Sequence, residues 1–155
     1  MYSEKWDKRY LKLAVLVADW SKDPRKQCGA VILDDGKIKG VGYNGFPRGV
    51  KDTKARLLDK HLKLKIIVHA EVNAIVASEG KGDCIYVYPQ LPCGQCMGLL
   101  IQAGIKRVVT LPLSPDTLWD QDLVVEMAKE AGVEIVTYSV RSYLKLVITN
   151  SRQQP

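Results

Sequence analysis

The sequence lacks any apolar run long enough to span a membrane, because the longest one, near the N-terminus, is interrupted by Lys12 and Asp19. Its first residues do not lead into a signal peptide, since the segment behind them has the periodicity of an amphipathic helix. A cytoplasmic protein is therefore expected. Internal repeats and low-complexity segments are also missing, and 155 residues suit a single domain with a buried core, so we expect residues 1–155 to form one domain.

Cysteines and acidic residues are both scarce. Four cysteines in a chain of this kind are typical of free thiols or metal ligands rather than of a disulfide framework. Only 17 acidic residues oppose 23 basic ones, which gives a net charge of +6. This excess favours anionic partners, either a nucleic acid or a phosphorylated small molecule, and charge alone does not choose between them.

Alternating helices and strands predict an α/β fold. We expect helices on both faces of a mostly parallel sheet that follows an opening hairpin, with the functional site at the carboxyl ends of the strands. The predicted helices are 4–20, 70–78, 93–103 and 120–131, and the predicted strands are 28–33, 38–43, 84–88, 105–111 and 133–138.

Smaller expectations accompany this pattern. One side of the first helix should carry the apolar residues Trp6, Tyr10, Leu13, Ala14 and Val17, and one side of the second should carry Val72, Ile75 and Val76. The basic segment 51–65 is a further candidate helix and is expected to face solvent. Residues 141–149 are expected to be ordered, but their type is ambiguous.

His69, Cys93 and Cys96 form a candidate metal site. The two cysteines lie one turn apart at the start of a predicted helix, where the helix dipole favours thiolates. Three protein ligands leave the fourth position of a tetrahedral zinc ion open, which marks a catalytic site. Water bound at such a position loses a proton near neutral pH, and Glu71 is placed to move protons there.

Two other interpretations of these residues compete. Cys-x-x-Cys is also a redox motif, and Cys28 or Cys84 would turn the site into a closed structural zinc. A redox motif requires neither Pro92 nor the His-x-Glu pattern, and both alternative cysteines lie in predicted strands as small buried residues. The combined H-x-E…P-C-x-x-C pattern is the signature of zinc-dependent nucleobase deaminases.

With these motifs, residues 8–140 resemble the deoxycytidylate (dCMP) deaminases of the cytidine deaminase-like superfamily. The H-A-E and P-C-x-x-C motifs occur across the superfamily, whereas the G-Y-N-G-x-P-x-G motif is narrower and indicates the deoxycytidylate branch. The stretches that carry the resemblance are Ser21–Pro24, Gln27–Ile32, Gly42–Gly49, His69–Ile75, Pro92–Cys96 and Ile101–Ile105.

The resemblance implies a three-layer α/β/α sandwich around a five-stranded mixed sheet, and the hydrolysis of dCMP to dUMP and ammonia. It assigns one zinc ion to His69, Cys93 and Cys96. Glu71 would carry protons from the zinc-bound water to ring N3 and then to the departing ammonia. The Ala70 N–H would hold the pyrimidine carbonyl.

Further substrate contacts follow from the same resemblance. Asn44 would contact the sugar and phosphate, Ser21 and Arg25 would lie near the phosphate, and Trp119 would cover the base. Residues 45–68 contain no cysteine and only one histidine, His61, so the second zinc of some relatives is not expected.

Many members of this family are hexamers that dCTP activates with Mg²⁺ and that dTTP inhibits. An exposed Phe46 beside Arg48 suits base packing and phosphate pairing, although the segment also reads as a simple tight turn. The effector loop is expected to comprise Gly42, Tyr43, Asn44, Gly45, Phe46, Pro47, Arg48 and Gly49.

The main rival is a deaminase of nucleic acid, acting on tRNA adenosine or single-strand cytosine. The net charge permits it, but the G-Y-N-G-F-P-R-G stretch and the lack of a separate RNA-binding module disfavour it. A deaminase of free nucleosides is disfavoured by the basic loops. No membrane contact is expected.

Overall fold

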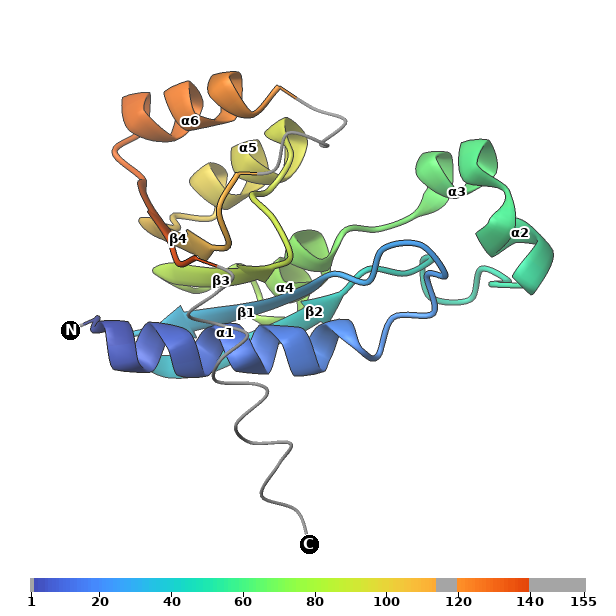
Figure 1. The fold of residues 1–155 in the computed structure, drawn as a ribbon, viewed down its shortest axis with the longest axis horizontal. Helices are drawn as coiled ribbons and strands as arrows, with labels where there is room; N and C mark the ends of the chain where they lie inside the picture. Colours follow the sequence, from blue (N-terminus) through green and yellow to red (C-terminus); the bar gives the residue numbers. More distant parts are fainter. Residues whose placement is uncertain (1, 114–119, 140–155) are drawn as a thin grey trace, which may run out of the picture.

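The computed structural model describes residues 2–113 and 120–139, which form a five-stranded sheet with helices on both faces (Figure 1). The strands lie in the order β2-β1-β3-β4-β5. The elements are α1 (Glu4–Ala18), β1 (Gly29–Asp34), β2 (Lys37–Tyr43), α2 (Lys54–Leu58), α3 (Lys60–Ile66), α4 (Ala70–Ala77), β3 (Cys84–Tyr88), α5 (Gly94–Gln102), β4 (Arg107–Thr110), α6 (Gln121–Glu130) and β5 (Glu134–Thr137).

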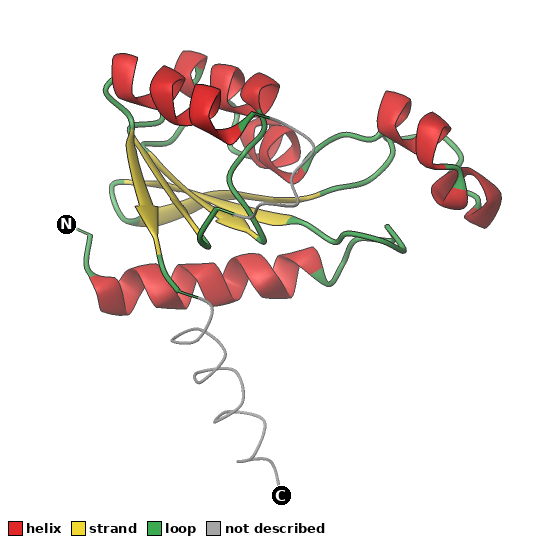
Figure 2. Cartoon of the chain, turned by 45° about the horizontal axis from the view of Figure 1, so that its top comes forward, coloured by secondary structure: helices red, strands yellow, loops and turns green. Residues whose placement is uncertain are grey.

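The sheet is mixed because β1 runs antiparallel to both of its neighbours, β2 and β3, whereas β3, β4 and β5 pair in parallel. Helix α1 covers one face, and α4, α5 and α6 cover the other (Figure 2). The predicted three-layer α/β/α sandwich is therefore confirmed. None of the helices in the described part of the chain combines the length and the apolar character that crossing a bilayer requires.

Helices α2 and α3 differ from the rest because they pack against each other and stand apart from the sheet (Figures 1 and 2). They occupy the basic segment 51–65, for which a solvent-facing surface was expected. That expectation is wrong at Lys63, which is only 5% exposed.

Helix α4 lies unusually close to strand β2 because the strand carries glycine at the contact. A Cβ atom on Gly42 would lie 2.2 Å from the Ala70 carbonyl oxygen, and one on Gly40 would lie 2.8 Å from that of Ala74. The helix accordingly buries its small residues, Ala70 and Ala74, while Val76 is 71% exposed. The predicted apolar side of this helix was therefore wrong at Val76.

The buried side of α1 also differs from the predicted one. Trp6 is 47% exposed, whereas the neighbouring Asp7 is completely buried. Both carboxylate oxygens of Asp7 accept hydrogen bonds from Arg107 at 2.8 Å, and the hydroxyls of Tyr86 and Tyr138 also donate to it. The buried side of α1 thus includes a polar residue that was not among its predicted members, and this residue is hydrogen-bonded as its burial requires.

The segment 141–149 and Trp119 lie outside the described residues.

Candidate metal centre and its cavity

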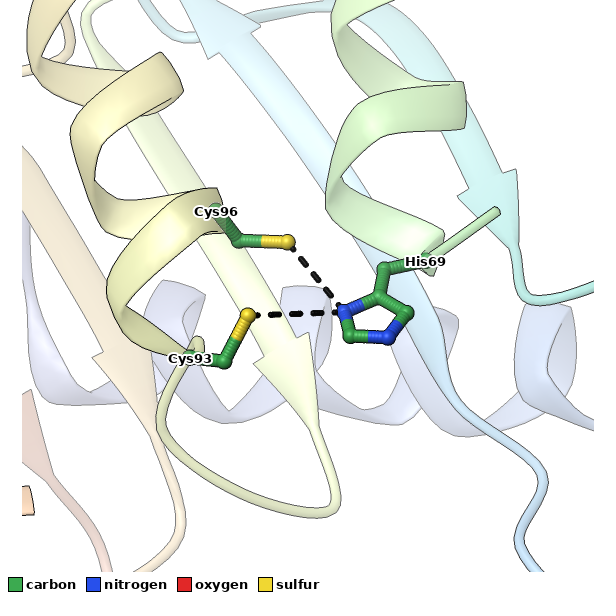
Figure 3. Close-up of side chains that lie close together, drawn as sticks. All are labelled: His69, Cys93 and Cys96. Carbon is green, nitrogen blue, oxygen red and sulfur yellow. Dashed lines mark hydrogen bonds between the residues drawn. The ribbon is translucent and has the colours of Figure 1, made fainter. Parts of the chain in front are cut away.

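The structure brings the three predicted metal ligands together from two helices (Figure 3). His69 is the N-cap of α4, Cys93 is the N-cap of α5, and Cys96 lies in the first turn of α5. The Nδ1 atom of His69 is 3.3 Å from Cys96 Sγ and 3.5 Å from Cys93 Sγ. All three ligand atoms lie within 4.8 Å of one another.

This arrangement fits zinc. With Zn–N bonds near 2.0 Å and Zn–S bonds near 2.3 Å, tetrahedral ligand atoms lie roughly 3.5 Å apart. Within residues 2–113 and 120–139, no fourth histidine, cysteine or carboxylate joins the group. Cys84 belongs to the core that α1 covers, and Cys28 lies in the cavity wall outside the group. The geometry favours a centre with an open position.

The pKa values of the two cysteine thiols are shifted in opposite directions. A hydrogen bond from Cys96 and a second from His69 lower the pKa of Cys93 to about 4. The pKa of Cys96 is raised because its thiol donates to Cys93 and is buried. The hydrogen bond to Cys93 also raises the pKa of His69, against the opposing effect of burial. The surroundings of Cys93 therefore favour its thiolate, the form of cysteine that binds a cation.

Glu71 lies in the first turn of α4 and is only 6% exposed. Burial raises the pKa of its carboxyl group above the ordinary value. Ala70 precedes it as the first residue of the helix, so its N–H has no partner within the helix. Both residues line the same cavity as His69 and Cys93. A buried carboxyl group and a backbone N–H with no partner in its helix thus lie beside the candidate metal ligands.

The cavity has a volume of about 210 Å³. Its wall contains two of the three candidate metal ligands, His69 and Cys93, together with apolar and basic side chains. It is lined by Asp23, Arg25, Lys26, Cys28, Asn44, Lys60, Lys63, Leu64, Ile67, His69, Ala70, Glu71, Val87, Tyr88, Gln90, Leu91 and Cys93. Four basic side chains against two acidic ones suit an anionic compound with an apolar ring.

Of the residues predicted to contact the substrate's sugar and phosphate, some line the cavity and one does not. Arg25 lines the cavity, and so does Asn44, whose amide is already engaged with backbone. The Asn44 Oδ1 atom accepts from the Cys28 N–H at 2.8 Å, and Nδ2 donates to the Lys26 carbonyl at 2.9 Å. Ser21 is buried outside the cavity wall, where its hydroxyl donates to the Asn44 carbonyl at 2.7 Å. Ser21 and Asn44 therefore fix the loop that presents Arg25.

Sequence reasoning missed the contribution of α3 to this cavity. Lys60, Lys63, Leu64 and Ile67 all line it. Their spacing by three and four residues is the pattern of one helical face, and that was the available signal. The partner of Lys63 is Asp23, forty residues away, and no local pattern indicates such a pair.

The predicted effector loop lines a second, smaller hollow of about 140 Å³. The other residues that line it are Trp20, Lys22, Asp23, Asp52, Leu57 of α2, and Ile67. Tyr43, Asn44, Gly45 and Phe46 contribute to it, and Arg48 does not. Phe46 is partly buried rather than exposed as expected. The Gly45 and Val68 backbones exchange hydrogen bonds of 3.1 and 2.8 Å, so the loop is paired with the residue that precedes His69.

Comparison with known proteins shows that the chain is similar to one family over most of its length. Residues 4–111 match the model of the cytidine and deoxycytidylate deaminase zinc-binding region. An uncharacterised deaminase of Aliivibrio fischeri is 39% identical over 136 residues, which cover 84% of this chain and 92% of that protein. The deoxycytidylate deaminase of Mus musculus is 36% identical over 154 residues, which cover 92% of this chain and 84% of that protein.

Among solved structures, the dCMP deaminase of the cyanophage S-TIM5 in complex with dCMP and dUMP superimposes with a TM-score of 0.70. The match covers 89% of this chain and 100% of the phage chain at 22% sequence identity. At that identity the likeness shows a common fold.

Proposed function

Because the chain belongs to the cytidine and deoxycytidylate deaminase family, we propose that it hydrolyses dCMP to dUMP and ammonia. The observation that carries this proposal is the grouping of His69, Cys93 and Cys96 beside the buried Glu71, in a cavity with basic walls. Relatives that share a third or more of the sequence are named deoxycytidylate deaminases, which supports the same substrate.

His69, Cys93 and Cys96 would hold one zinc ion. When bound, zinc acts as a Lewis acid that lowers the pKa of a coordinated water to about 7 and so supplies a nucleophile at neutral pH. The cysteine thiolates and the neutral imidazole are the ligand types that zinc prefers.

Glu71 would carry the protons of the reaction. Its carboxylate would accept one proton from the attacking water and deliver it to ring N3 of cytosine. It would then accept the second proton, from the hydroxyl left on C4, and deliver it to the amino group, which leaves as ammonia. Because burial raises its pKa, the carboxyl group binds and releases a proton closer to neutral pH than an exposed glutamate does. The Ala70 N–H would donate to the pyrimidine carbonyl and orient the ring.

The basic wall would bind the 5′-phosphate. Arg25 and Lys60 line the cavity and form no ion pair with another described residue, so their charges are available to an anion. Asn44 and Ser21 are proposed to serve the same subsite by holding the loop that carries Arg25. A phosphate site of this kind favours a nucleotide over a free nucleoside.

The test is a comparison of substrates for the zinc-loaded protein. Loss of cytosine absorbance is followed with dCMP, deoxycytidine, cytosine-containing single-stranded DNA and tRNA, with inosine formation measured for the tRNA. We expect turnover of dCMP, weak turnover of deoxycytidine and none of the polymers. Turnover of tRNA or DNA without turnover of dCMP would replace this proposal with the rival one.

We also propose that dCTP with Mg²⁺ activates the enzyme and that dTTP inhibits it through the loop at residues 42–49. The backbone pairing of Gly45 with Val68 supports this, because a shift of the loop would be transmitted to the neighbouring His69.

Copies of the chain are proposed to assemble, with a hexamer favoured. Exposed apolar residues such as Ile38 on β2 and Val76 on the neighbouring α4 support contacts between copies. Sedimentation with and without each effector tests the assembly.

A further inference from the structure

Lys63 and Asp23 form a buried ion pair in the wall of the active-site cavity. The Lys63 Nζ atom lies 2.8 Å from Asp23 Oδ1, and the two side chains are only 6% and 4% exposed. The other ion pairs of the described residues are at least partly open to solvent, apart from that of Asp7 with Arg107 behind the sheet. Burying two charges is costly, so a pair at this position calls for a reason other than stability.

Asp23 organises the loop that presents basic groups to the cavity. Its Oδ1 atom accepts hydrogen bonds from the backbone N–H of Arg25 at 2.8 Å and of Lys26 at 3.2 Å. Its Oδ2 atom accepts from the Asn44 amide at 3.4 Å. A carboxylate at this position therefore shapes the loop, but its negative charge lies in the same wall as the basic groups that would bind phosphate.

We propose that Lys63 determines the specificity of the site for a phosphorylated substrate by cancelling the charge of Asp23. This rests on the proposed deamination of dCMP. Lys63 belongs to α3, so the helix that stands apart from the sheet supplies the positive charge that neutralises Asp23 in the proposed phosphate subsite. The pair lets the loop keep its carboxylate without repelling an anion.

The size of the effect follows from Coulomb's law. For a phosphate taken to bind about 8 Å from the unpaired carboxylate, at an effective dielectric constant of about 20, loss of Lys63 would weaken binding roughly 30-fold for each unit of negative charge on the phosphate. A neutral nucleoside carries no phosphate and would feel little of this repulsion. The loss should appear in KM for dCMP rather than in kcat, since the reacting ring is bound elsewhere in the cavity.

The test compares Lys63→Met, Asp23→Asn and the double variant, each with dCMP and deoxycytidine as substrates. Lys63→Met should raise KM for dCMP at least about 30-fold and change kcat/KM for deoxycytidine less than about 3-fold. Asp23→Asn retains an oxygen for the Arg25 and Lys26 N–H groups and should leave KM for dCMP within about 3-fold of wild type. The double variant should recover most of the affinity that Lys63→Met loses. Binding of dUMP and deoxyuridine as competitive inhibitors should follow the same order.

Lys81→Met is the matched control, because it removes a lysine from an exposed pair with Glu79 and should change neither substrate. Equal losses for dCMP and deoxycytidine in Lys63→Met, or a double variant as weak as Lys63→Met, would overturn the inference and leave the pair a structural one. If Lys63→Met does not fold, a selective rise in KM for dCMP in Asp23→Asn would likewise overturn the inference, because that variant leaves the Lys63 cation without its carboxylate and should not repel phosphate. A wild-type protein that turns over neither substrate would instead reject the proposed function.

Discussion

Replacing Glu71 by glutamine should abolish turnover while leaving the metal site intact. The substitution keeps the size of a side chain that is only 6% exposed, and Glu71 is not one of the three grouped ligands. It removes the group that would accept and return the protons of the reaction. The loss should therefore fall on kcat.

The expected size follows from the role of the carboxyl group. General acid–base catalysis contributes between about 10²- and 10⁴-fold, and here one carboxyl would serve in successive proton transfers. The other acidic side chain in the cavity wall, Asp23, is held by Lys63 and cannot replace it. We expect a loss of about 10⁴-fold in kcat, which is roughly 5.4 kcal/mol of transition-state stabilisation.

The assay is dCMP turnover with zinc content and thermal unfolding measured on the same samples. In the metal-free protein, the raised pKa of Glu71 means that the folded state disfavours the carboxylate, so this group costs stability once the pH passes its unfolded value. Glutamine removes that cost, and the metal-free variant should be at least as stable as wild type at neutral pH. A variant that binds zinc normally and keeps more than about a tenth of the activity would refute the assigned role.

Three further substitutions test the scaffold and the loop. Gly42→Ala should cost about 1–3 kcal/mol in urea unfolding and reduce turnover, because its Cβ would lie 2.2 Å from the Ala70 carbonyl oxygen; an unchanged midpoint would contradict this. Arg107→Met should cost about 3–5 kcal/mol, because it leaves the Asp7 carboxylate buried without its cation. Burial opposes the shift, but hydrogen bonds from Arg107, Tyr138 and Tyr86 hold the pKa of Asp7 below its ordinary value, so wild-type stability should fall as the pH drops through that lowered value; a loss confined to alkaline pH would rule this out. Arg48→Ala should weaken dTTP inhibition more than basal turnover, and an identical inhibition curve would count against the loop assignment.

The order of most elements and the grouping of the three candidate metal ligands could be predicted because both depend on local patterns. Residue periodicity fixes helices and strands over short windows. The candidate ligands are of a few chemical types and stand at helix starts. The H-x-E…P-C-x-x-C signature predicted that His69, Cys93 and Cys96 would meet, and the structure groups them.

Contacts between distant polar residues could not be predicted. Asp7 is paired with a residue one hundred positions away, and Lys63 with one forty positions away. The sequence neighbours of Asp7 and of Lys63 include charged residues that are typical of a protein surface. Each charged side chain can be buried only because the folded chain brings an oppositely charged partner to it. Periodicity alone therefore missed Asp7 on the buried side of α1 and treated the segment around Lys63 as solvent-facing.

The outward position of Val76 has a different cause. Helix α4 packs closely against β2 because glycine and alanine lie at the contact. These small residues contribute little to a hydrophobic periodicity pattern. A pattern that weighs side chains by size places the larger valine inside, whereas close approach of two backbones selects the smallest residues.

The most direct test of the metal centre is X-ray absorption spectroscopy at the zinc edge, with metal analysis of protein purified without added zinc. The account predicts one zinc per chain, with one nitrogen and two sulfur ligands from the protein and a remaining oxygen ligand. His69→Ala should lose the metal. Protein without zinc, or zinc bound by a third sulfur, would contradict the account.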